Sequence, residues 1–390
     1  MNKRLRAQLL SGQPAATPLE VAQRLLAVQG QDPRGARLAV RARTAGLRAG
    51  DVDRAMTVER DLVTTWLNRG TLHVVASEDY WWLHPLTTRA LHAGNARRLH
   101  QEGVSPAAAD KGVAIIERSL AEDGPLTRPQ LRERVAAAGV RVEGQALVHI
   151  LVRASLRGLI VRGPVVAGEQ AHALVRDWLG TPPPPLDDNV ALGRLGHRYL
   201  AGHGPASERD LAKWAGITVT AARRAFAAIA TTVERRADGL IDLAGRARPA
   251  APPPPRLLGA FDPLLLGWAS RQPVLGPHQH VVTVNGIFRP IALVRGRAIG
   301  TWRLQDRTVE ITPFDSLPPD ESPDSGERAA LAAEAGDVVR FLFGTRGGAT
   351  PGAEQAGEPG AGSAGRRSGV AGAETSNAPT ARARSPGGAA

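Results

Sequence analysis

The sequence of 390 residues contains no cysteine. This absence excludes disulfide bonds, thiolate zinc sites and cysteine-held iron–sulfur clusters. Of the ten histidines, only His278 and His280 form a close pair, and no nearby carboxylate or third histidine completes a set of metal ligands. We therefore expect neither a metal site nor another cofactor.

Long apolar runs are also missing. No stretch approaches the roughly 18 uninterrupted apolar residues of a membrane-spanning helix, and the first residues lack the pattern of a signal peptide. We expect a soluble, cytoplasmic protein with no membrane partner. No heptad seam is visible either, so we expect a monomer.

Lysine is scarce: only Lys3, Lys111 and Lys213 occur among 49 basic residues, and the net charge is +12. Such a basic chain makes a polyanion the first partner to consider, and the guanidinium of arginine can grip a phosphate with two hydrogen bonds. A GC-rich genome could account for part of the arginine bias. The charge is therefore suggestive and not decisive.

Two proline runs divide the chain, TPPPPLDD at 181–188 and RPAAPPPP at 248–255. Both are expected to be stiff, extended connectors. Residues 345–390 are rich in Gly, Ala, Ser and Pro with almost no large apolar side chain, which predicts a disordered tail.

A pattern of helix, turn, helix and hairpin recurs between these breaks. In residues 121–180, Thr127 opens a capping box, a second helix runs from about Glu143, and a hairpin follows Gly158. The same order appears in residues 189–247, and a looser version in residues 1–120 ends in a hairpin that turns at Asn-Arg-Gly. We predict three winged helix-turn-helix units.

Residues 256–344 are instead rich in strands, with Asn-Gly and Arg-Gly turn signals, and close with a helix. We predict an α+β domain there. The predicted fold class is mainly α with α+β: tandem winged helix-turn-helix units followed by a strand-rich C-terminal α+β domain.

The stretch LLAVQGQDPRGARLAVRAR, residues 25–43, places two neutral amides, Gln29 and Gln31, before a run of arginines. In one interpretation the glutamines bond to the end of a helix and Gly30 takes the left-handed cap position. In the other, the chain leaves the helix in extended form, which aims both amides to one side. Asp32 is interpreted as a turn residue before Pro33, although it could also supply negative charge.

Over roughly residues 1–343 the chain resembles the bacterial winged-helix DNA glycosylases that excise N-alkylated purines, unhook interstrand cross-links and are associated with self-resistance to alkylating antibiotics. The likeness is carried by residues 25–43 and by TWLNRGTLHVVASEDYWWLHPL, AFDPLLLGWASR and GIFRPIALVRGRAIGTWR. That family has a catalytic pair written Gln, apolar residue, Gln. The resemblance implies that Gln29 and Gln31 are this pair, with Gly30 where the family usually has a small apolar residue, and that the partner is double-stranded DNA carrying alkylated purines.

Two amides suit such a substrate, because a purine alkylated at N7 or N3 is already cationic and leaves as a neutral base. Only a positioned water and stabilisation of the sugar cation remain to be supplied. A lyase reaction would need a lysine amine, and the three lysines lie in terminal or solvated surroundings, so we expect base removal without strand cleavage.

Several arginines are candidates for contacts to DNA phosphates, although a solvated surface is the alternative. Arg34, Arg37 and Arg41 share one helix face by their spacing, Arg69 lies at a hairpin tip, and Arg271 follows the AFDP segment. Trp66, Trp81 and Trp82 are expected in the core because each lies in an apolar run. The competing hypotheses are a winged-helix transcriptional regulator and a catalytically silent DNA-binding protein.

Overall fold

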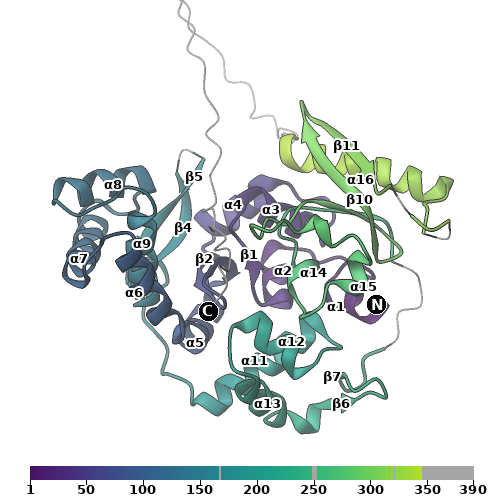
Figure 1. Cartoon of the computed structure of the whole chain (residues 1–390), viewed down its shortest axis with the longest axis horizontal. Coiled ribbons are helices and arrows are strands. Elements are labelled where there is room, and N and C mark those ends of the chain that lie inside the picture. Colours follow the sequence, from purple (N-terminus) through teal and green to yellow (C-terminus); the bar gives the residue numbers. More distant parts are fainter. Residues whose placement is uncertain (167, 248–252, 316, 320, 345–390) are drawn as a thin grey trace, which may run out of the picture.

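The computed structural model describes residues 1–166, 168–247, 253–315, 317–319 and 321–344. The predicted tail, residues 345–390, lies outside these ranges. In the described part, helices combine with three β-sheets into a curved body, with α6 to α9 at one end and β10, β11 and α16 at the other (Figure 1). No helix within the described ranges has both the length and the apolar content to cross a bilayer.

The N-terminal region alternates short helices with strands. Its elements are α1 (Asn2–Ala7), α2 (Pro18–Leu25), β1 (Val28–Gln29), α3 (Pro33–Arg41), α4 (Ala49–Thr57), β2 (Leu62–Leu67), β3 (Thr71–Ala76), α5 (Ser77–Thr88), α6 (Leu91–Gln101) and α7 (Pro106–Asp123). The hairpin between β2 and β3 turns where predicted, because Asn68 and Gly70 both have positive φ angles, of 55° and 83°.

The next segment follows the predicted order of helix, helix and hairpin. It comprises α8 (Arg128–Ala137), α9 (Ala146–Leu156), β4 (Ile160–Val166), β5 (Glu169–Leu174) and α10 (Val175–Trp178). Both contacts of the predicted capping box at Thr127 are present, with Gln130 as the reciprocal partner. These two hydrogen-bond contacts explain why α8 starts where it does.

One five-stranded sheet, in the order β1-β3-β2-β4-β5, crosses the expected boundary at residue 120. Strand β2 of the first unit pairs with β4 of the second at Thr64 and Arg162. The two predicted units are therefore joined through a common sheet, and β1 is one of its two edge strands.

The third segment, after the first proline run, contains α11 (Asp188–His203), α12 (Glu208–Ala215), α13 (Val219–Ala227), η1 (Ala230–Thr232), β6 (Val233–Arg235) and β7 (Ile241–Leu243). A capping box at Ser207 and Asp210 starts α12, and Gly216 ends it in the left-handed conformation, with φ of 70°. Both signals act as the sequence predicted.

The C-terminal region is a four-stranded sheet, in the order β11-β10-β9-β8, with α16 packed on it. Its elements are β8 (Arg256–Leu258), α14 (Pro263–Leu266), α15 (Gln272–Leu275), η2 (Gln279–Val281), β9 (Ile291–Val294), β10 (Arg297–Gln305), β11 (Thr308–Pro313) and α16 (Ser325–Phe343). Trp302, Val338 and Phe341 share a core cluster with Val21 and Leu25 of α2. The two ends of the described chain are therefore folded onto each other.

A fully buried ion pair fixes this contact. The guanidinium of Arg43, just after α3, donates to both carboxylate oxygens of Asp262 at 2.9 and 2.8 Å, and neither side chain is exposed to solvent. Gln8 accepts two further hydrogen bonds from Arg43, at 2.9 Å through its backbone oxygen and 3.0 Å through its side chain. The charge is thus satisfied on all sides, as burial requires.

We expect Asp262→Ala to lower the free energy of unfolding by about 3–5 kcal/mol, because it leaves a buried guanidinium without its counter-charge. Urea denaturation followed by circular dichroism would measure the loss. Asp188→Ala is the control: it removes the partner of Arg89 in an exposed pair and should leave stability nearly unchanged. Equal stability of the two variants would contradict this role for the buried pair.

Candidate active site

Gln29 and Gln31 lie between α2 and α3, at the end of the short strand β1. Helix α2 ends at Leu25, and Leu26 then takes a positive φ of 65° that turns the chain into β1. Gly30 is not among the residues with positive φ, and its N–H donates to the carbonyl of Leu72 at 2.8 Å. The helix-cap interpretation is therefore wrong: the chain leaves α2 in extended form through β1, and both glutamines line one cavity.

A cavity of about 580 Å³ lies beside the pair. Gln29 is only 6% exposed, and its Oε1 is buried without a hydrogen-bond partner among the described residues. Gln31 is exposed at the rim. The remaining lining consists of three cations, apolar side chains and a polar loop, namely Arg69, Thr71, Lys213, Phe261, Leu266, Trp268, Arg271, Asn285, Gly286, Ile287 and Phe288.

His73 is the cross-strand neighbour of Gln29 in the pairing of β3 with β1. Its Nδ1 donates to the carbonyl oxygen of Thr71 at 2.9 Å. Burial, reinforced by the nearby charge of Arg69, lowers the pKa of His73 to about 3. The imidazole beside the pair is consequently neutral at pH 7 and cannot serve as an acid for a leaving group.

The cations of the cavity come from three separate segments. Arg69, at the β2–β3 turn, donates through Nη1 to the carbonyls of Lys213 and Trp214, at 3.1 Å each. Arg271 donates through Nε to Leu265 at 2.9 Å and lies 4.8 Å from the centroid of the Phe288 ring. No acidic side chain occurs among the described lining residues, so the cavity favours an anionic ligand.

Desolvation lowers the pKa values of both arginines, and the charge of Arg271 adds to the effect at Arg69. Two guanidiniums thus line one cavity without a counter-charge from the residues that the structure describes. This arrangement is costly for the protein alone and becomes favourable once a phosphate enters.

The helix α3 distributes its predicted DNA-binding arginines over three environments. Arg34 is exposed, whereas Arg37 is half-buried and donates to Asp53 at 2.8 Å. Arg41 is a correction: it is 3% exposed, and it pairs with Glu334 at 2.8 Å and Asp337 at 3.1 Å. Its guanidinium holds α16 against α3 and cannot reach a phosphate from this position.

The model of the AlkZ-like DNA glycosylase family matches residues 22–341 of the chain, a span that includes the glutamine pair and all the lining residues of the cavity. The chain belongs to the AlkZ-like DNA glycosylases. The family activity makes it a hydrolase that acts on DNA.

A curated relative and a solved structure agree with this assignment. The chain is 27% identical over 346 residues to an interstrand DNA cross-link repair glycosylase of Streptomyces sahachiroi, covering 80% of this chain and 88% of the relative. It also resembles the structure of the DNA glycosylase AlkZ from the same organism, with a TM-score of 0.70, 24% identity, and coverage of 87% of this chain and 94% of that one. The structural likeness shows a common fold.

In this AlkZ-like glycosylase, Asp32 has a local role. Its Oδ1 accepts a hydrogen bond from the backbone N–H of Arg34 at 2.9 Å, which caps the start of α3. The carboxylate of Asp32 therefore stabilises the helix that follows the pair.

The three tryptophans were predicted to lie in the core. Trp66 and Trp82 are buried, at 9% and 5% exposure, and Trp81 is half-buried.

Sequence reasoning missed several residues of the cavity. Lys213 is exposed as expected, yet it lines the same cavity as the glutamines, and its Nζ donates to the carbonyl of Ala269 at 3.0 Å. Phe261 and Phe288 were not singled out although both lie in segments that carry the family resemblance. Their position in those segments was the only feature of the sequence that could have pointed to them.

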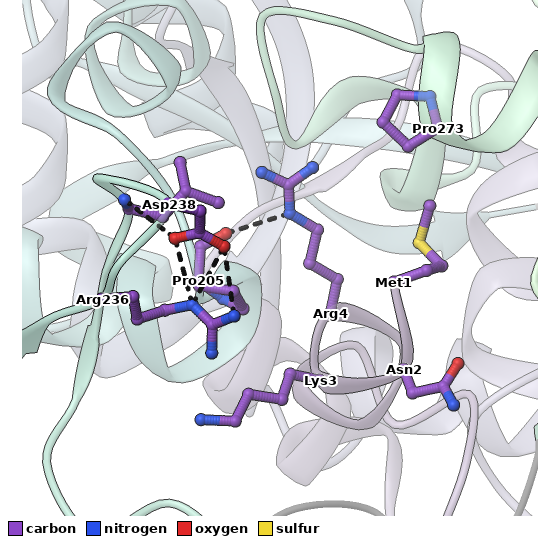
Figure 2. Close-up of a pocket in the computed structure, with 9 residues that line it drawn as sticks. Met1, Asn2, Lys3, Arg4, Pro205, Arg236, Asp238 and Pro273 are labelled. Atoms are coloured by element: carbon purple, nitrogen blue, oxygen red, sulfur yellow. Dashed lines mark hydrogen bonds and ion pairs between the residues drawn. The ribbon is translucent and has the colours of Figure 1, made fainter.

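A different cavity of about 580 Å³ lies between α1 and the β6–β7 turn (Figure 2). Four of its lining residues pair with each other: Arg236 with Asp238 at 3.1 Å, and Arg4 with the carbonyl of Pro205 at 2.9 Å. It holds neither glutamine of the pair. In the described ranges, no cluster of three or more potential metal ligands was found in any part of the fold.

Gly30 leaves room for little more than a methyl group. A Cβ built there would lie 3.3 Å from methyl carbons of both Thr64 and Val74. We expect Gly30→Ala to change the free energy of unfolding by less than about 1 kcal/mol and to preserve base release, because two methyl groups can yield slightly. Gly30→Leu should destabilise by about 1–3 kcal/mol through overpacking.

Thermal denaturation and release of base from alkylated DNA would measure both variants. A tenfold or greater loss of activity in a stably folded Gly30→Ala would contradict the expectation. It would mean that the strand requires glycine for a reason other than space.

Proposed function

We propose that this glycosylase hydrolyses the N-glycosidic bond of purines alkylated at N7 or N3 in double-stranded DNA, and that it unhooks interstrand cross-links. The observation that carries the proposal is a cavity lined by two neutral amides, Gln29 and Gln31, with no acidic side chain among its described lining residues. The Streptomyces sahachiroi relative is an interstrand DNA cross-link repair glycosylase, which supports the second part.

The missing carboxylates define the substrate. Hydrolysis of an ordinary glycosidic bond uses one carboxylic acid to protonate the leaving group and one carboxylate to activate water or trap the sugar. A neutral purine would need that acid. An N7- or N3-alkylated purine does not, because it carries a positive charge that is lost when the bond to the sugar breaks.

The reaction balances without an added acid. The oxygen of a water forms a bond to C1′ while the C1′–N9 bond breaks, and the bonding electron pair neutralises the departing purine. The water releases one proton to solvent. The orphaned Oε1 of Gln29 can accept a hydrogen bond from this water, and the amide dipole of Gln31 can face the sugar cation.

Tandem winged helices would carry the DNA. The arrangement of α8, α9 and the β4–β5 hairpin supports one unit, and α12, α13 and the β6–β7 hairpin support another. The looser N-terminal unit consists of α2, α3, α4 and the β2–β3 hairpin, whose turn carries Arg69 into the cavity. We propose that the protein acts in this way as a monomer.

Contacts to phosphates are proposed for Arg69 and Arg271 in the cavity, and for Arg34 and Arg37 near the start of α3. Arg69 and Arg271 are held by backbone carbonyls, which orients their guanidiniums while leaving other N–H groups for a ligand. Such fixed donors lose little freedom when a phosphate binds.

We expect Gln29→Ala and Gln31→Ala each to slow base release by about 10²-fold, the scale of removing one preorganised polar group at a transition state. Release of 7-methylguanine from alkylated duplex DNA under single-turnover conditions would measure it. Gln23→Ala is the matched control, because Gln23 on α2 bonds to Glu78 and does not line this cavity; it should keep the wild-type rate.

Two results would contradict the proposal. Undiminished release in both glutamine variants would refute the site. No release by the wild-type protein from any alkylated or cross-linked duplex, despite tight binding, would favour a DNA-binding regulator or a silent relative instead.

We expect base removal without strand cleavage, although Lys213 lines the cavity. A Schiff base needs a neutral amine, and no described lining residue is a carboxylate that could accept the ammonium proton, while Ala269 holds the group by a hydrogen bond. Borohydride reduction during the reaction should trap no covalent complex. A trapped complex that disappears in Lys213→Met would show lyase activity.

A further inference from the structure

A second cavity, of about 380 Å³, lies on the other side of Gln31. Strand alternation assigns the two cavities to opposite faces of the five-stranded sheet: Thr71 lines the first, whereas the adjacent Leu72 lines the second. Gln31 follows the edge strand β1 and lines both. Whatever occupies the second cavity is therefore next to the candidate catalytic pair.

Arg162 on β4 is the main charge in this cavity. It forms neither an ion pair nor a hydrogen bond through its side chain with any residue that the structure describes, and its Nε is buried without a partner. Burial, together with the positive charge of Arg128, lowers the pKa of Arg162 to about 10, and Glu169 only partly offsets this. Arg162 is thus a largely buried cation whose charge the described residues offset only in part.

Arg128, the first residue of α8, adds a second cation to the same wall. It is exposed, and within the described ranges its side chain also has no ion-pair or hydrogen-bond partner. Arg153 and Arg157, by contrast, both pair with Asp110, at 2.8 and 2.6 Å. Arg128 and Arg162 are therefore two arginines, unpaired in the described part of the chain, that line one cavity.

His172 is the third polar group of the cavity. It is paired with Arg162 across β4 and β5, it is only 2% exposed, and neither of its ring nitrogens has a partner within normal hydrogen-bond geometry among the described residues. Its pKa is lowered to about 3, first by burial and then by Arg162, and the backbone of Leu126 offsets this only in part, so the ring is neutral and offers an N–H donor. A buried histidine without a well-formed hydrogen bond is unusual and points to an absent partner.

Hydrogen-bond donors and positive charges thus line one cavity, and the described residues around it supply little negative charge to balance them. Glu169 is the one carboxylate among the described lining residues, and it is exposed. The ligand that satisfies such a site is an anion with several acceptor oxygens. In a DNA glycosylase the anion present at high local concentration is the phosphate of the substrate backbone.

We propose that Arg162 and Arg128 bind a DNA phosphate in the second cavity, with His172 as an additional donor. The first cavity, with Arg69, Lys213 and Arg271, would bind phosphate on the other face of the sheet. In this arrangement the DNA strand crosses the edge of the sheet at β1. Gln31 then lies between the phosphate-binding residues of the first cavity and those of the second. The inference rests on the family's activity on DNA and is independent of the adduct proposed above.

The test measures binding of the full chain to an undamaged duplex over a series of salt concentrations, so it requires no base release. Arg162→Met and Arg128→Met keep an unbranched, flexible side chain and remove the charge. Each should weaken binding about tenfold near 0.1 M salt and reduce the slope of log affinity against log salt by about 0.9. Arg153→Met and Arg157→Met are matched controls and should leave the slope unchanged.

A second variant keeps the proposal falsifiable if Arg162→Met folds poorly. Glu169 is exposed, so Glu169→Gln should fold normally and tighten binding by about two- to threefold, because it removes the single negative charge of the wall. Thermal denaturation would verify folding of every variant.

Unchanged slopes in both arginine variants, or equal losses in the controls, would overturn the proposal. Competition by free dGMP at micromolar concentration would also overturn it, because the cavity would then be a nucleotide site. Failure to release alkylated bases would leave these binding measurements unaffected, so the two proposals can fail separately.

Discussion

The buried ion pair between Arg43 and Asp262 is the constraint on which the candidate active site depends. Arg43 follows α3, the helix that begins directly after the glutamine pair, and Asp262 caps α14 beside Phe261 in the wall of the cavity. The pair therefore fixes two walls of one cavity that are 219 residues apart in the chain. Neighbouring groups supply further hydrogen bonds to both charged side chains, and this network holds Arg43 and Asp262 in a fixed position.

A second constraint acts at the edge of the sheet. The positive φ of Leu26 ends α2 abruptly and sends the chain into β1, where it is held by β3. Only an extended backbone can direct Gln29 and Gln31 to the same side, since residues two apart on a helix diverge. Preorganised amides need no rearrangement at the moment of reaction, and this is what electrostatic stabilisation requires.

The distribution of charge separates binding from chemistry. Cations line the cavity walls where a phosphate would lie, whereas the two amides assigned to the reaction are neutral, and so is the neighbouring His73 with its depressed pKa. A site without an acid or a carboxylate has little power over an undamaged nucleoside. Selectivity for damage would then follow from the weakness of the catalytic groups.

The sequence by itself determined the local elements and the location of the pair. Capping boxes at Thr127 and Ser207 and the turn at Asn68 predicted their helices and hairpin correctly, because each signal acts over a few residues. The resemblance located Gln29 and Gln31 within a family whose model covers most of the chain. The helical spacing of Arg34, Arg37 and Arg41 placed them on one face and could not show which of them is buried in an ion pair.

Only the tertiary structure decided which charges are available to a ligand. Arg41 is lost to α16 because Glu334 and Asp337 lie nearly 300 residues further along the chain, whereas Arg162 stays unpaired in the sheet. Lys213 enters the cavity from another segment altogether. Ion pairing and desolvation depend on distance in space, and a sequence records only distance along the chain.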